Sequence, residues 1–137
     1  THKKISESTE SVIQDRSIYE DAEIFARNLY EIGNIAQRDY DNYVALYTVM
    51  TDYLRVPDLM IYLRASVDTL KKQIEKRGRE YEQSIPATYL EQLNAHYETW
   101  ISNYSKGTLL VIESDGIDFV HNGKDFIEVV RLVKENL

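Results

Sequence analysis

The chain has 137 residues, with 16 lysines and arginines against 23 aspartates and glutamates, so its formal net charge is −7. This acidic balance argues against general binding to nucleic-acid phosphates, and no apolar run approaches the ~20 residues of a membrane-spanning helix. The absence of cysteine excludes disulfides, thiolate metal sites and a cysteine nucleophile, and fits a reducing compartment such as the cytoplasm. With only 5 glycines, the sequence contains neither G-x-x-x-x-G-K-[ST] nor G-x-G-x-x-G, the two common phosphate-binding patterns.

A chain of this length is typical of a single domain, and its first part predicts a strand followed by a helix. The short β-branched segment Val12–Gln14 is expected to be a strand. Ser17 and Glu20 have the spacing of a capping box, so a helix is expected to begin at Ile18. Apolar residues then recur at helical spacing until Gly33, which ends the helix.

The middle of the chain predicts a helix, a strand and another helix. The apolar stripe of residues 38–54 indicates a helix that stops before Pro57. Residues 58–63 (DLMIYL) form an almost continuous apolar run, which is typical of a strand buried on both faces of a parallel sheet. Ser66 is expected to cap a third helix, and Gly78 to end it.

The last part of the chain predicts a charged loop, a helix that starts with proline, a second buried strand, another loop and a closing helix. They cover residues 77–85, 86–104, 108–112, 113–123 and 125–137. The predicted order is therefore β-α-α-β-α-α-β-α. Strands separated by helices imply an α/β fold in which helices cover a parallel sheet.

Asp15 and Arg16 are the first candidates for chemistry, because they lie where the first predicted strand meets the first helix. Ligands of open α/β sheets bind at the carboxyl ends of strands. A carboxylate there can hold Mg²⁺, and an arginine can bind a phosphate. The alternative is a solvated ion pair worth ~0–1 kcal/mol.

Arg77 and Arg79 flank Gly78 at the end of the third predicted helix, and Glu80 and Glu82 follow. A mobile loop of this kind can close over a phosphoryl group and neutralise its charge. The alternative is that the two cations only complement the negative end of the helix dipole. For this segment considered alone, the second interpretation is favoured.

Asp21 and Phe25 are four residues apart and therefore share a face of the first predicted helix. Phe25 fits an apolar core. A carboxylate such as Asp21 beside an apolar stripe can accept hydrogen bonds from a nucleobase, although residue type alone favours a solvated side chain. The 11 tyrosines and Trp100 recur mostly at helical spacing, so they are expected to serve core or subunit packing.

Three segments taken together resemble the deoxynucleoside kinase family, in family order through nearly the whole chain. They are residues 15–21 with Phe25 and 28–30, residues 57–63, and residues 77–86 with Tyr89, Leu90 and Leu93. The resemblance implies a P-loop-kinase-like parallel sheet with helices on both faces. It also implies that residues 1–137 belong to one kinase domain, with a lid at about 77–86.

The activity implied by the resemblance is transfer of a phosphoryl group from ATP, with Mg²⁺, to the 5′-hydroxyl of a deoxynucleoside, for nucleotide salvage. Asp15 matches the family's acidic residue associated with Mg²⁺. Arg16 matches the catalytic arginine near the 5′-hydroxyl and the transferring phosphate. Arg77 and Arg79 match the lid arginines that contact the ATP phosphates.

Further matches concern the substrate and the adenine of ATP. Glu82 matches the lid glutamate that reaches the sugar 3′-hydroxyl, Asp21 a position that contacts the base edge, and Phe25 one that lines the base pocket. The loop after the second buried strand borders the ATP adenine in the family, so Asp115 and Phe119 are expected cofactor-binding residues. Aspartate at the position of Asp21 accompanies deoxyadenosine, deoxyguanosine or deoxycytidine as substrate, whereas thymidine-accepting relatives have a small residue there.

The resemblance also has consequences for assembly and completeness. Family members are homodimers through the helices that match residues 18–32 and 87–104. Gln73 stands where many relatives have a further lid arginine. The family's phosphate loop has no counterpart in this sequence, which resembles a C-terminal part of such a kinase. Because the family's phosphate-loop strand would lie between residues 12–14 and 58–63, a polypeptide that starts at Thr1 is expected to be inactive and prone to aggregate.

Two other functions remain open at this point. A nucleoside monophosphate kinase shares the chemistry but uses a different lid, so the match over residues 77–86 argues against it. A non-catalytic dimerisation or binding module is the other, since the aromatic helix faces permit it; such a module would not be stabilised by ATP or dATP. No nucleic-acid or membrane partner is expected.

Overall fold

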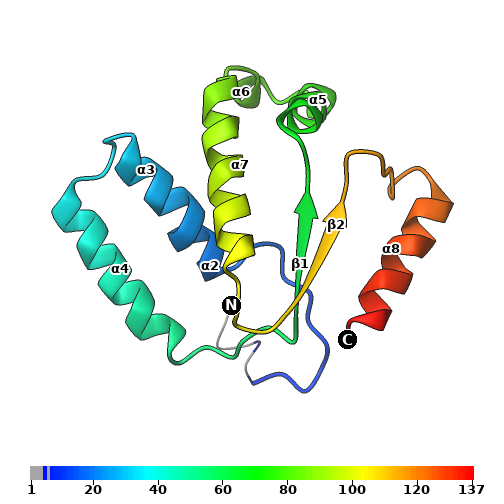
Figure 1. Cartoon of the computed structure of the whole chain (residues 1–137), viewed down its shortest axis with the longest axis horizontal. Coiled ribbons are helices and arrows are strands. Elements are labelled where there is room, and N and C mark those ends of the chain that lie inside the picture. Colours follow the sequence, from blue (N-terminus) through cyan, green and yellow to red (C-terminus); the bar gives the residue numbers. More distant parts are fainter. Residues whose placement is uncertain (1–4, 6) are drawn as a thin grey trace. The chain divides into compact units, whose positions relative to one another are not determined.

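The computed structural model describes Ile5 and residues 7–137. Within it the chain forms two compact units, Thr1–Val56 and Pro57–Leu137. The first unit consists of helices, and the second holds the sheet (Figure 1).

The first unit contains one continuous helix whose middle turn is widened. It is made of α2 (Ile18–Glu20), the π-helical segment η1 (Asp21–Ala26) and α3 (Arg27–Glu31). The predicted capping box is confirmed, because the Ser17 hydroxyl accepts from the Tyr19 amide and the Glu20 carboxylate accepts from the Ser17 amide at 2.8 Å. Periodicity alone did not predict the π-helical turn, a rare feature that is frequent at functional sites.

Helix α4 (Gln37–Thr51) packs on this first helix through tyrosines. The ring of Tyr40 stacks on that of Tyr30, with centroids 4.5 Å apart. The Tyr47 hydroxyl donates to the Glu23 carboxylate at 3.5 Å. The predicted role of the tyrosines in packing therefore holds for this pair of helices.

The strand predicted over Val12–Gln14 is wrong, since this segment has no regular secondary structure. Val12 is 48% and Ile13 is 98% exposed. β-Branched residues favour extended backbone, but a strand is stabilised by its pairing with a neighbour. Among the described residues, only the two strands of the second unit pair with each other.

The second unit is built on two parallel strands, β1 (Leu59–Arg64) and β2 (Thr108–Glu113). Both were predicted within one residue of their observed ends. In their register, Tyr62 pairs with Val111. The parallel α/β architecture predicted from the element order is thus confirmed for this unit.

Four helices belong to the second unit together with these strands. They are α5 (Val67–Arg77), α6 (Glu80–Gln83), α7 (Ala87–Ser102) and α8 (Gly123–Glu135). The Ser66 hydroxyl accepts from the Thr69 amide at 3.2 Å, and Gly78 ends α5 with a φ of 68°, as predicted for both residues. The segment predicted as a charged loop contains the short helix α6, which is a single turn closed by a bond from the Glu82 amide to the Arg79 carbonyl at 3.0 Å.

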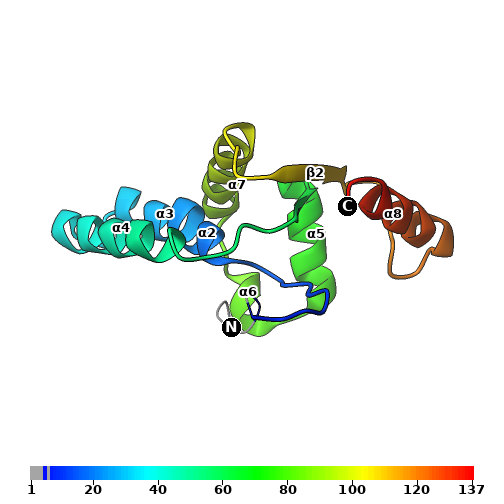
Figure 2. The ribbon, with the colours of Figure 1, turned by 90° about the horizontal axis from the view of Figure 1, so that it is seen from below.

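The core of the second unit lies on both faces of the two strands, because α7 lies to one side of them and α8 to the other (Figure 1, Figure 2). On the α7 side, Tyr62 stacks on Tyr97 at 5.7 Å between ring centroids. On the opposite face Leu110 and Ile112 are buried, with Ile112 only 2% exposed. Within the described part of the chain, no helix is both long and apolar enough to cross a membrane.

Candidate active site

Arg16 has the most unusual backbone of the described chain. Its φ is 61°, and no other described non-glycine residue has a positive φ. The Gln14 side-chain amide donates to the Arg16 carbonyl at 2.7 Å, which supports this left-handed conformation. For a residue with a Cβ the conformation costs about 1–2 kcal/mol, and such strain clusters at functional sites.

The structure brings Arg16 together with Phe25. The guanidinium carbon lies 4.8 Å from the centroid of the Phe25 ring, which is the geometry of a cation–π contact. Arg16 is exposed and Phe25 is half-buried within η1. Phe25 of the widened turn and Arg16, which precedes the helix, therefore place an aromatic ring and a cation together in the first unit.

Two carboxylates accompany this pair. Asp21 is exposed at the start of η1, and its charge adds to burial in raising the pKa of Tyr43 on α4. Asp15 is exposed and directly precedes Arg16. No cluster of three potential metal ligands occurs among the described residues. A single accessible carboxylate nevertheless fits Mg²⁺, which often takes one or two carboxylates and completes its shell with water and substrate phosphates.

The predicted lid lies in the second unit, where the Glu82 carboxylate accepts hydrogen bonds from both Arg77 and Arg79. Arg77 Nη1 donates to the two carboxylate oxygens at 3.2 and 3.3 Å, and Arg79 Nη1 donates to Oε1 at 3.1 Å. The Glu82 side chain is 11% exposed, whereas those of Arg77 and Arg79 are 51% and 53% exposed. Hydrogen bonds to Glu82, and then to Tyr81, raise the pKa of Arg79. The three charges sum to +1 at a half-exposed surface.

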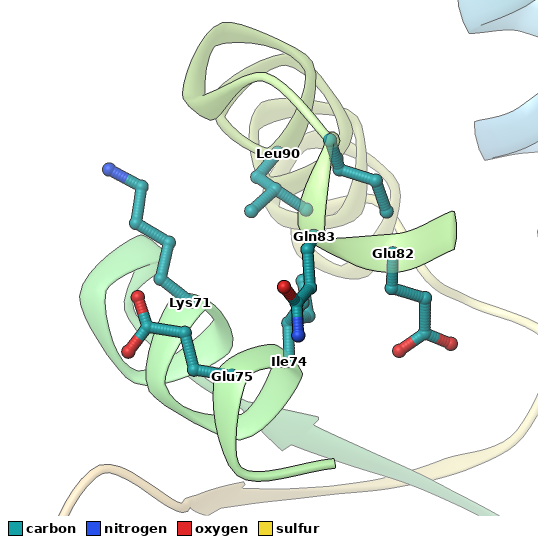
Figure 3. Close-up of a pocket in the computed structure, with 7 residues that line it drawn as sticks. Lys71, Ile74, Glu75, Glu82, Gln83 and Leu90 are labelled. Atoms are coloured by element: carbon teal, nitrogen blue, oxygen red, sulfur yellow. The ribbon is translucent and has the colours of Figure 1, made fainter. Parts of the chain in front are cut away.

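A pocket of about 350 Å³ lies next to Glu82. It is lined by Lys71, Ile74, Glu75, Glu82, Gln83, Ile85 and Leu90. Figure 3 shows Gln83 directed into the space above α5, while the Glu82 carboxylate points away from Lys71 and Glu75. Glu82 thus contributes the stem of its side chain to the pocket and its charge to the arginines.

Asp115, predicted to border ATP adenine, makes a local structural bond. Its carboxylate accepts from the Ser66 amide at 2.7 Å, at the beginning of α5. This backbone bond, followed by one to the Thr69 side chain, lowers the pKa of Asp115. Phe119 is half-buried in the same loop, in which Asp118 accepts from the His121 amide at 3.0 Å.

The predicted site residues thus form two groups. Asp15, Arg16, Asp21 and Phe25 belong to the first unit, and Arg77, Arg79, Glu82, Asp115 and Phe119 to the second. Sequence reasoning missed Gln14, and also Tyr81, whose hydroxyl accepts from Arg79 Nη1 at 3.2 Å. The spacing of Arg79 and Glu82, three apart in one turn, was a signal for their ion pair.

Comparison with known proteins supplies the family. The deoxynucleoside kinase family model matches residues 1–137. The chain belongs to the deoxynucleoside kinase family. Of the curated relatives, it is 35% identical over 130 residues to a deoxyadenosine/deoxycytidine kinase and 38% identical over 128 residues to a deoxyguanosine kinase, both of Bacillus subtilis (strain 168).

The alignments cover most of this chain but less than two thirds of each of these two relatives. The two alignments include 93% and 90% of this chain but 60% and 59% of the relatives. Among solved structures, a deoxyadenosine kinase from M. mycoides with bound dATP matches with a TM-score of 0.76 and 29% identity, covering 96% of this chain and 67% of that one. The same enzyme with bound dCTP matches with a TM-score of 0.72 and 30% identity, covering 88% of this chain and 62% of that one. The α/β kinase fold expected from the sequence is therefore confirmed.

Proposed function

We propose that the full-length protein transfers the γ-phosphoryl group of ATP to the 5′-hydroxyl of a deoxynucleoside, with a purine deoxynucleoside or deoxycytidine as acceptor. Membership of the family supports the class of reaction. The observation that carries the proposal is the lid, in which Arg77 and Arg79 converge on one buried carboxylate and keep a net positive charge. Phosphoryl transfer depends mainly on positioning and charge stabilisation, which such a lid supplies.

The proposed roles of the first unit are those that the family resemblance implies for its residues. The face of Phe25 stacks on the base, and the Asp21 carboxylate accepts hydrogen bonds from its exocyclic amino group. Adenine, guanine and cytosine carry such an amino group and thymine does not, so the carboxylate favours the first three. Arg16, held in a strained conformation next to Phe25, donates to the 5′-oxygen and the phosphoryl group that it attacks.

The proposed roles of the second unit concern ATP and the sugar of the nucleoside. Arg77 and Arg79 donate to the phosphates of ATP, while Glu82 accepts from the sugar 3′-hydroxyl. Phe119 and the loop that contains Asp115 border the adenine of ATP. Asp15 would hold Mg²⁺, which when bound neutralises charge on the ATP phosphates.

The assembly and setting form part of the proposal. The protein is a cytoplasmic homodimer that serves nucleotide salvage, and a polypeptide that starts at Thr1 is inactive by itself. The dimer is checked by the solution mass of the full-length protein. Activity of residues 1–137 alone with ATP and deoxyadenosine would contradict the expected inactivity.

An acceptor panel tests the proposed reaction. The full-length protein is incubated with ATP, Mg²⁺ and deoxyadenosine, deoxyguanosine, deoxycytidine, thymidine or the corresponding monophosphates, and ADP formation is followed. We expect turnover with at least one of the first three nucleosides and much less with thymidine. Turnover with monophosphates alone would favour a nucleoside monophosphate kinase. No turnover with any acceptor would favour a non-catalytic module.

A further inference from the structure

Glu82 is a buried acidic residue with two cationic partners, and its role extends beyond any contact with the acceptor. We propose that Glu82 is a positioning residue that holds Arg77 and Arg79 side by side for the phosphate donor. This inference rests on the proposed function, because it concerns how the lid binds ATP. It assigns Glu82 an effect on the donor, whereas the family resemblance implies only an effect on the nucleoside sugar.

The backbone brings the two arginines to the same carboxylate. Arg77 is the last residue of α5, Gly78 turns the chain with a φ of 68°, and Arg79 directly precedes α6. The carboxylate oxygens of Glu82 lie 3.1–3.3 Å from the Nη1 atoms of Arg77 and Arg79. The negative charge thus lies between two positive charges that would otherwise repel each other. The carboxylate therefore allows the guanidinium groups to gather before any phosphate arrives.

The bridge leaves donors for a ligand. A guanidinium has five N–H donors. Every hydrogen bond that the side chains of Arg77 and Arg79 make to described residues uses Nη1 alone, to Glu82 and, for Arg79, also to Tyr81. The Nε and Nη2 donors of both side chains therefore stay available to phosphate oxygens while Glu82 holds the other branch. Phosphate can bind without displacing the carboxylate.

Burial makes Glu82 the fixed member of the cluster. Its side chain is 11% exposed, against 51% and 53% for the two arginines, and α6 closes through a backbone bond from its amide to the Arg79 carbonyl. Long exposed arginine side chains lose rotamer freedom when they bind a ligand. A buried carboxylate that orders them beforehand lowers this cost and so strengthens donor binding.

Kinetics of the full-length protein test the proposal with Glu82→Gln, which keeps the size of the side chain and removes its charge. We expect the KM for ATP to rise about tenfold, equivalent to about 1.4 kcal/mol, with a smaller change in the KM for the nucleoside. The matched control is Glu80→Gln, at an exposed acidic residue in the same turn, and it should leave both KM values unchanged. Equal thermal melting of the variants checks that the fold is intact.

A double-mutant cycle separates positioning from direct contact. In an Arg79→Met background only Arg77 remains for Glu82 to hold, so Glu82→Gln should raise the KM for ATP by at most about threefold. A tenfold rise in both backgrounds, or a rise confined to the KM for the nucleoside, would overturn the proposal. In the latter case Glu82 would act through the acceptor alone.

A spectroscopic measurement makes the outcome independent of turnover. In nucleotide-free protein labelled with ¹⁵N-arginine, hindered rotation should give Arg77 and Arg79 separate Nη1 and Nη2 signals, which merge in Glu82→Gln and persist in Glu80→Gln. Unchanged arginine signals in Glu82→Gln would overturn the positioning role. Absence of nucleoside phosphorylation by the wild-type protein would instead overturn the proposed function and, with it, the role in donor binding.

Discussion

The strained backbone of Arg16 predicts an unusual order of stability for two substitutions. At a φ of 61°, a side chain with a Cβ costs about 1–2 kcal/mol that glycine avoids, whereas glycine loses about 0.5–1 kcal/mol more backbone entropy than alanine. Arg16→Gly and Arg16→Ala both remove the contact with Phe25, so that loss cancels between them. Arg16→Gly should therefore be more stable than Arg16→Ala by about 0.5–1 kcal/mol.

The control for this comparison is Arg27, which is exposed at the beginning of α3 with an ordinary helical φ of −60°. There the order should reverse, with Arg27→Gly less stable than Arg27→Ala by about 1 kcal/mol. Urea unfolding of the four full-length variants measures both differences. The same order at both positions would refute a left-handed Arg16. Both Arg16 variants should also lose phosphoryl transfer. The effect of Arg16 on activity would then be distinct from its effect on the stability of the protein.

Three further predictions concern the second unit. Ser66→Ala removes the cap of α5 and should lower the free energy of unfolding by about 1 kcal/mol, measured by urea unfolding. Ile112→Ala, at a side chain that is 2% exposed, should cost about 2–5 kcal/mol, whereas Leu63→Ala, at one that is 47% exposed, should cost much less; equal losses would contradict the assigned core. Hydrogen bonds, led by that from the Ser66 amide, lower the pKa of Asp115 in the folded protein. The ionised carboxylate therefore stabilises the fold at pH values above the ordinary carboxyl pKa of about 3.9. This stabilisation is lost as the pH falls through the lower pKa of the folded protein. Asp115→Asn should therefore be less stable than wild type at pH 7, and this difference in stability should shrink as the pH falls below about 3.9, as followed by thermal melting; a difference that does not change with pH would contradict this.

Local sequence signals predicted most of the fold. The capping box at Ser17, the cap at Ser66 and the left-handed Gly78 depend on a few neighbouring residues, and all three are present as expected. The segment Val12–Gln14 was predicted wrongly because a strand depends on a partner outside the local sequence. The π-helical turn at Asp21–Ala26 was also missed, since a widened turn depends on packing that periodicity does not encode.

The candidate site was predictable as a set of residues but not as a set of contacts. The segments that resemble the deoxynucleoside kinase family identified Arg16, Phe25 and the lid arginines as candidates. The contact between Arg16 and Phe25 depends on the left-handed backbone, which no residue type at that position signals. The bridge from Glu82 to both arginines depends on the turn of α6, where the sequence predicted only a charged loop.

Phosphoryl transfer to the 5′-hydroxyl of a deoxynucleoside is recognised by the position of the transferred group in the product. The full-length protein is given ATP labelled in the γ-phosphate with deoxyadenosine, deoxyguanosine or deoxycytidine, alongside the 5′-deoxy analogue of each as a blank. We expect label in a 5′-monophosphate from at least one nucleoside and none from any analogue. Label in no nucleoside product, or equal labelling of an analogue, would contradict it.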